Sequence, residues 1–198
     1  MNDTSPRALF NGAISCSFPS RLQDVSSIRD VPDNQEIYAD PSRDESIIVE
    51  ILEHEGSVAD AQSAVWFLQD LSHEQDAGQS LVLEDVKELT LADTPLLGSQ
   101  YVVNAAVGRM AVSKGRQGAE AQNLLRVYLA NIRLPNVNTD ILVTVNEPLL
   151  ISEESESAKV VGAGVAVSAE AAGVMPASEI FHLVLATFKI NDWGLFGN

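Results

Sequence analysis

Short apolar runs separated by polar turns dominate the chain, and this pattern predicts many strands and few helices. The clearest strand covers 46–53, where β-branched residues are bounded by polar turns. Further strands are predicted at 36–39, 80–89, 100–112, 124–134 and 140–146, the last of them stopped by Pro148. Because the turns between them are short, the strands should pair antiparallel; parallel pairs need long crossovers.

Two further patterns refine this picture. Asn11-Gly12 interrupts an apolar stretch over 8–18, and because both residue types accept positive φ, a hairpin is predicted there. An amphipathic helix is predicted over 58–75, where apolar residues recur at steps of three and four. A second helix should open at Pro176, since proline suits the first turn.

The remaining segment, 151–175, is an acidic run followed by alanine, glycine and valine, and we interpret it as a flexible surface excursion. Lys114 and Arg116, with nearby glycines, are expected in a small basic turn. No internal repeat is visible. Residues 1–198 are therefore expected to form one α+β domain, with an antiparallel sheet covered by helices.

The charge is lopsided, with 28 Asp and Glu against 12 Lys and Arg, a formal net charge of −16. Such a surface repels nucleic-acid phosphates and anionic lipids, so neither is expected as a direct partner, whereas a basic protein surface would be attracted. The alternative is that acidity only keeps the protein soluble. No run approaches the roughly 20 apolar residues of a membrane span, and the first residues lack a targeting pattern.

The chain offers no constellation for catalysis. His54, His73 and His182 are scattered, and neither a His-Glu-x-x-His pair nor a Gly-x-Ser-x-Gly elbow nor a P-loop occurs. Cys16 is the single cysteine, which excludes an intrachain disulfide and a cysteine-based zinc site. We therefore expect neither an enzyme nor a bound cofactor or metal, and a protein-binding role remains.

An acidic turn stands out as the candidate contact site. The sequence Val-Pro-Asp-Asn-Gln-Glu over 31–36 places Asp33 and Glu36 just before a predicted strand. Proline fixes its own φ, and Asp and Asn favour tight turns. A purely local role is the alternative, in which Asp33 caps the turn and Glu36 solvates the strand start. Glu50 and Glu53 are further rim candidates that a solvated strand face also explains.

Five segments together resemble the Ran guanine-nucleotide release factor family, the Mog-type proteins. They are Leu-Phe-Asn-Gly-Ala-Ile at 9–14, the stretch 24–36 containing the acidic turn, the strand 45–53, the pair 132–135 and 139–148, and the terminal Leu-Phe-Gly at 195–197. The second is the most specific. Asn11 stands where the family usually has a second glycine, but asparagine also tolerates positive φ.

The resemblance implies a single α/β/α domain with a mainly antiparallel sheet and helices on both faces, a fold shared with the PsbP proteins of photosystem II. It also implies binding to the small GTPase Ran, promotion of guanine-nucleotide release, and a part in nuclear transport. We expect the protein to be a monomer that occurs in nucleus and cytoplasm. On this chain the family's functional acidic residues match Asp33 and Glu36. Three alternative functions are an acidic trafficking adaptor without exchange activity, a photosystem accessory protein and an unrecognised enzyme. The lack of a plastid targeting segment disfavours the second.

Overall fold

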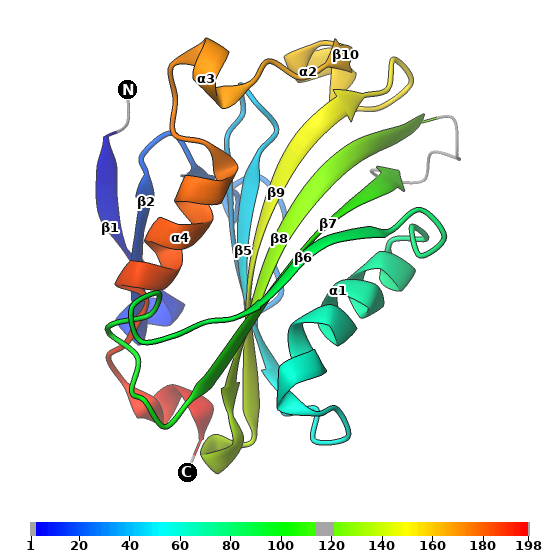
Figure 1. Ribbon diagram of the computed structural model, residues 1–198. Coiled ribbons are helices and arrows are strands. Elements are labelled where there is room, and N and C mark those ends of the chain that lie inside the picture. The colour runs from blue at the N-terminus through cyan, green and yellow to red at the C-terminus, as the bar shows by residue number, and fades with distance from the viewer. Residues whose placement is uncertain (1–2, 114–120, 198) are drawn as a thin grey trace.

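The computed structural model describes residues 3–113 and 121–197, and its strands form two antiparallel sheets (Figure 1). The larger sheet has the strand order β3-β4-β5-β9-β8-β7-β6, with β10 paired to β9. Its strands are β3 (Gln23–Asp24), β4 (Gln35–Ala39), β5 (Ser46–Glu53), β6 (Val82–Glu88), β7 (Val102–Ser113), β8 (Gln122–Leu134), β9 (Thr139–Ile151) and β10 (Gly164–Val165). The prediction of antiparallel pairing is confirmed, although β5 pairs with the distant β9 rather than with the next strand along the chain.

A smaller sheet joins the two ends of the chain. It contains β1 (Thr4–Leu9), β2 (Ile14–Pro19) and β11 (Lys189–Ile190). The predicted hairpin links β1 to β2, with positive φ at Asn11 and Gly12 as expected. Phe10 also has a positive φ of 49°. This conformation is unfavourable for a bulky side chain, so neighbouring contacts must hold it.

Strand β9 is longer than predicted, because Pro148 does not end it. The strand continues to Ile151, and the register against β8 shifts between Leu124 and Leu125, with Pro148 opposite Leu125. Proline lacks an N–H and is tolerated in a sheet at such irregularities. The predicted end near 146 is therefore wrong, and the added length extends the sheet toward the 151–175 segment.

Two helices are long, α1 (Ser63–Glu74) and α4 (Ala177–Thr187). The shorter ones are η1 (Phe10–Gly12), η2 (Asp60–Gln62), η4 (Pro135–Val137), α2 (Ala158–Val161), α3 (Ala169–Ala172) and η5 (Trp193–Phe196). Helix α1 begins five residues later than the 58 predicted from periodicity. The reason is that the carbonyl oxygens of Glu55 and Val58 accept hydrogen bonds from the Arg133 side chain. They are thereby held in a loop that leads to η2.

Two hydrophobic cores lie on opposite faces of the larger sheet. Ile141 and Val143 of β9 belong to one core and Leu142 between them to the other, as the alternation of side chains along a strand requires. Helix α1 packs against β7 and β8 in the second core. Helix α4, with β1 and β2, completes the first core. The mixed α/β class is confirmed, whereas the small sheet on the α4 face was not predicted.

The segment 151–175, expected to be a flexible excursion, carries α2, β10 and α3 across one end of the larger sheet (Figure 1). It contacts the turn after β4. Arg43 Nη2 donates to the Val167 carbonyl at 2.9 Å, and Ser157 Oγ donates to Asp44 Oδ2 at 2.7 Å. The basic turn predicted around Lys114 and Arg116 lies outside the described residues. Within the described ranges, no helix has the length and apolar character to cross a membrane.

Candidate functional site

The acidic turn at 31–36 is fastened to β5 by its central asparagine. The Gln35 N–H donates to the Pro32 carbonyl at 2.9 Å, which closes the turn. The Asn34 carbonyl accepts from the Ile51 N–H, and Asn34 Nδ2 donates to the Ile51 carbonyl at 3.1 Å. Asp33, at the tip, is exposed to solvent. The turn therefore presents the Asp33 carboxylate on a backbone that is already held in place.

Glu36 is placed differently from Asp33. Its Oε1 accepts a 2.6 Å hydrogen bond from the Phe10 N–H, and its side chain is half-buried. The donor belongs to the residue that begins the run of positive φ in the β1–β2 hairpin. A charge-assisted bond of this kind is stronger than one between neutral groups. Glu36 thus holds the hairpin to β4, and the two residues predicted as one site lie in different environments.

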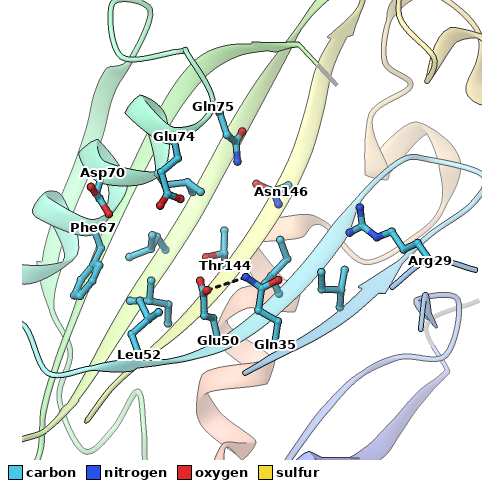
Figure 2. A pocket seen from close by; sticks show the side chains of 15 residues that line it. Arg29, Gln35, Glu50, Leu52, Phe67, Asp70, Glu74, Gln75, Thr144 and Asn146 are labelled. Carbon is cyan, nitrogen blue, oxygen red and sulfur yellow. Dashed lines mark hydrogen bonds between the residues drawn. The ribbon is translucent and has the colours of Figure 1, made fainter. Parts of the chain in front are cut away.

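The sheet separates Glu36 from its neighbour Gln35. In the β4–β5 pair, Glu36 lies opposite Val49 and Gln35 lies opposite Glu50. Val49 belongs to the core on the α4 face. Gln35 and Glu50 instead line a pocket on the α1 face, where Gln35 Nε2 donates to Glu50 Oε1 at 2.7 Å (Figure 2). The acidic turn therefore contributes Gln35 to the lining of a cavity that was not predicted from the sequence.

This pocket has a volume of about 360 Å³ and lies between α1 and the strands β4, β5, β8 and β9. Most of its apolar lining comes from the sheet, and Phe67 and Leu71 add to it from the helix. The polar side chains include three carboxylates. The lining residues are Arg29, Gln35, Ile37, Ile48, Glu50, Leu52, Phe67, Asp70, Leu71, Glu74, Gln75, Leu129, Leu142, Thr144 and Asn146.

The pocket is negatively charged. Glu50 from β5 and Asp70 and Glu74 from α1 contribute three carboxylates, and Arg29 is the one cation among the lining residues that the structure describes. Partial burial raises the pKa of Glu74, and repulsion from Asp70 and Glu50 raises it further. Glu50 was only a rim candidate in the sequence, and Asp70 and Glu74 were missed. Their spacing of four residues, beside an apolar helix face, was the available signal.

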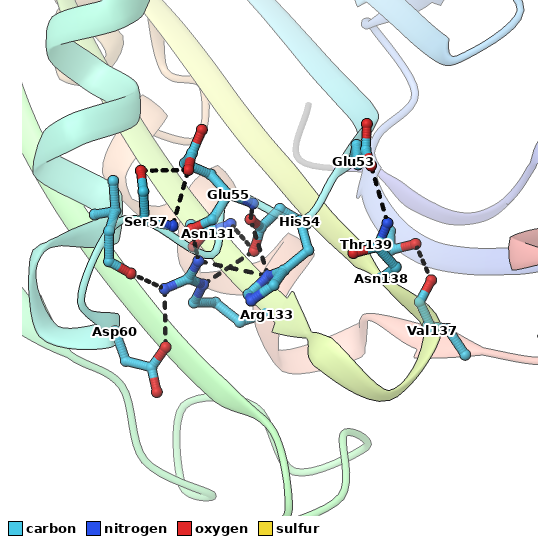
Figure 3. A network of polar contacts seen from close by, with 12 residues as sticks. Glu53, His54, Glu55, Ser57, Asp60, Asn131, Arg133, Val137, Asn138 and Thr139 are labelled. Carbon is cyan, nitrogen blue, oxygen red and sulfur yellow. Dashed lines mark hydrogen bonds and ion pairs between the residues drawn. The ribbon is translucent and has the colours of Figure 1, made fainter.

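A buried polar network fixes the loop before α1 (Figure 3). Arg133 on β8 is 2% exposed, and its Nε lies 3.1 Å from Asp140 Oδ1 on β9. Its Nη1 donates to Asp60 Oδ1 at 2.8 Å, while Asp140 Oδ2 accepts from the Glu55 N–H at 2.8 Å. His54 Nδ1 lies 3.3 Å from Asp140 Oδ2. These contacts set where α1 begins, and so where its carboxylates meet the sheet.

His73 and His182 have simple structural roles. The Nδ1 atom of each lies 2.7 Å from a carbonyl oxygen four residues earlier in its own helix, that of Gln69 and of Ser178. Cys16 is buried in the core, and burial raises the pKa of its thiol to about 12. In this state the thiolate that would react is disfavoured. None of these residues lines the pocket.

Comparison with known proteins identifies the family. A family model described as "Ran-interacting Mog1 protein" matches residues 7–148. The Ran guanine nucleotide release factor of Danio rerio is 34% identical, with 96% of this chain and 99% of that protein covered. The Homo sapiens protein of the same name is also 34% identical, over 75% of this chain and 78% of its own.

A solved structure agrees in fold. The crystal structure of the Saccharomyces cerevisiae Ran-binding protein Mog1p matches with a TM-score of 0.68 and 19% identity, and all of both chains is covered. At that identity the match shows the architecture alone. The match over 7–148 and the relative of nearly equal length together establish that this chain belongs to the Ran-interacting Mog1 family.

Proposed function

We propose that this protein binds the small GTPase Ran, promotes release of its guanine nucleotide and thereby supports nuclear protein import. The observation that carries the proposal is the 34% identity to a Ran guanine nucleotide release factor along nearly the whole of both chains. A relative in Schizosaccharomyces pombe, 29% identical over 71% of this chain, is named a nuclear import protein. The net charge of −16 supports a basic protein partner.

The mechanism we propose is thermodynamic linkage rather than catalysis. A protein that binds Ran more tightly when the nucleotide site is empty must, by thermodynamic reciprocity, weaken the binding of nucleotide to Ran in the same ratio. Asp33 would pair with a basic group of Ran from its exposed position on the turn. Glu36 would act at the same edge, either by exchanging its bond to Phe10 for one to Ran or by keeping the hairpin in place.

The proposal extends to the organisation of the chain. Residues 1–198 would form one domain of the α/β/α type, with the 151–175 segment as a surface excursion. We further propose that the protein acts as a monomer without a cofactor, works in nucleus and cytoplasm, and binds neither nucleic acid nor membranes. The strongly acidic composition supports the last point, because it repels phosphate groups.

The test is release of a fluorescent guanine nucleotide from purified Ran. The wild-type protein is expected to accelerate release, and Asp33→Ala and Glu36→Lys to lose most of that acceleration. Removing one partner of a desolvated charge pair costs about 2–5 kcal/mol, against about 0–1 for an exposed pair. Glu88→Ala, on the exposed edge strand β6, removes one negative charge elsewhere and serves as control.

Two outcomes would contradict the proposal. If both variants accelerate nucleotide release from Ran as much as the wild-type protein does, Asp33 and Glu36 are not the contact residues. If the wild-type protein binds Ran in a pull-down without accelerating release, it is a binding adaptor rather than a release factor.

A further inference from the structure

The pocket beneath α1 combines two surfaces of opposite character. Its apolar lining includes Ile48 and Leu52 from β5, Leu129 from β8, and Phe67 and Leu71 from α1. Its carboxylates come from both sides, Glu50 from the sheet and Asp70 and Glu74 from the helix (Figure 2). A ligand that fills it must offer apolar surface along its length and positive charge at one end.

The carboxylate on the sheet side is held in position before any ligand arrives. Gln35 Nε2 donates to Glu50 Oε1 at 2.7 Å, and Asn34 Nδ2 lies 3.5 Å from the same oxygen. Both donors belong to the acidic turn that resembles the family signature. The turn therefore orients Glu50, and a preorganised acceptor loses little conformational entropy when it binds a cation.

The chemistry of the pocket limits the classes of ligand that it can bind. Anions are repelled by three carboxylates, and within residues 3–113 and 121–197 no group of three or more His, Cys, Asp or Glu side chains could hold a metal ion. The apolar lining disfavours a small hydrated ion. An amino-acid side chain with an aliphatic stem and a cationic head matches both surfaces, because such chains bury the stem and keep the head among polar groups.

Lysine fits better than arginine. An ammonium group is a compact charge on an unbranched four-carbon stem and directs three donors in different directions, whereas the larger guanidinium keeps its five donors in one plane. Here the acceptors come from facing walls, Glu50 on β5 and Asp70 and Glu74 on α1. We propose that this pocket receives a lysine side chain of Ran, with its stem on the apolar lining and its ammonium between Glu50 and Glu74. This inference rests on the proposed function, which supplies the identity of the partner.

The first experiment does not depend on Ran. N-acetyl-lysine methylamide is titrated into isotope-labelled protein while backbone amide signals are recorded. Saturable shifts are expected at pocket residues such as Leu71 and Thr144, and they should disappear in the double variant Glu50→Gln/Glu74→Gln. N-acetyl-arginine methylamide is the matched probe. Absence of shifts with the lysine probe, or stronger binding of the arginine probe, would overturn the assignment to lysine.

The second experiment measures the affinity for Ran. The double variant is expected to bind at least about tenfold more weakly, since a lost charge pair in a partly desolvated site is worth more than 1.4 kcal/mol, or one factor of ten. Glu88→Gln should change affinity less than about twofold, because an exposed charge far from the contact contributes little. Equal affinities of double variant and control would refute the pocket as a Ran contact.

The two experiments separate this inference from the proposed function. If wild-type protein binds Ran and the pocket variants bind equally well, the inference fails and the function stands. If wild-type protein does not bind Ran, the proposed function fails and the assignment to Ran falls with it. The titration with the lysine probe then shows only whether the pocket takes a lysine side chain.

Discussion

The two faces of the sheet at β4 and β5 differ in how completely they are covered. On the α4 face, side chains from these strands enter a closed core with β1, β2 and α4, in which Ile47, Val49 and Phe188 are inaccessible to solvent. On the α1 face the helix leaves a pocket open beside the same strands. One strand pair therefore contributes to a stabilising core on one side and to an acidic cavity on the other.

This difference separates two adjacent residues of the acidic turn, Gln35 and Glu36. Glu36 lies on the α4 face and bonds to the Phe10 N–H, whereas Gln35, one position earlier, holds Glu50 on the pocket face. We infer that variants at neighbouring positions of this turn change different properties. Changes on the α4 face, which we call the closed face, should lower the stability of the protein. Changes on the α1 face, the open face, should alter binding and the pH dependence of stability.

The largest effect is expected from Phe188→Ala on the closed face. Phe188 is 0% exposed, and truncation of a buried Phe costs about 3–5 kcal/mol through lost burial and the cavity left behind. Leu71→Ala, in the half-buried lining of the pocket, should cost less, about 1–2 kcal/mol, because less apolar area is removed from water there. Urea unfolding of both variants measures the difference.

Ran binding supplies the control for this pair. Folded Phe188→Ala should bind Ran as the wild type does, since Phe188 does not line the pocket. If Leu71→Ala lowers the free energy of unfolding as much as Phe188→Ala, the distinction between a closed and an open face is wrong.

A smaller effect is expected from Glu36→Ala. It leaves the Phe10 N–H without its acceptor in a half-buried site, which should cost about 1–2 kcal/mol, while Glu36→Gln keeps an acceptor oxygen and should restore much of the loss. Asp33→Ala, at an exposed position, should stay within about 0.5 kcal/mol of wild type. Urea unfolding compares the three. Equal stability of Glu36→Ala and Asp33→Ala would show that the bond to Phe10 does not hold the hairpin.

Much of the strand pattern could be predicted because alternation and turn chemistry are local properties. The Asn11-Gly12 hairpin and the strand at 46–53 follow from residues adjacent in sequence. The failures come from distant contacts. Arg133 captures backbone carbonyls of the loop before α1 and so delays the helix, and Pro148 is accommodated by a register shift against β8. Neither contact is visible in the spacing of apolar residues.

The candidate site was predictable only in part, for the same reason. The turn at 31–36 was found, but Glu36 bonds to a residue 26 positions away, and Glu50 meets Asp70 and Glu74 only when α1 packs on the sheet. Sequence alone can show that Asp70 and Glu74 share a helix face with Phe67 and Leu71. It cannot show that this face leaves a cavity when it packs.

The smallest effect concerns the charge on the open face. Burial and the repulsion of Asp70 and Glu50 raise the pKa of Glu74 in the folded protein above its unfolded value. The folded state therefore holds this proton more tightly, and stability falls as the pH rises from the ordinary glutamate pKa of about 4.3 through the raised folded value. This loss of stability is complete above the folded-state pKa and absent below the ordinary glutamate pKa.

Glu74→Gln removes the ionisable group and should reverse this loss. At neutral pH the variant is expected to melt slightly higher than wild type, and below the ordinary glutamate pKa the two should melt together, because wild-type Glu74 is then protonated in both states. Thermal unfolding across this range measures the difference, with Glu88→Gln as the exposed control. A variant that melts lower than wild type at neutral pH would show that Glu74 already has a stabilising cationic partner. The open face would then be electrostatically satisfied without a ligand.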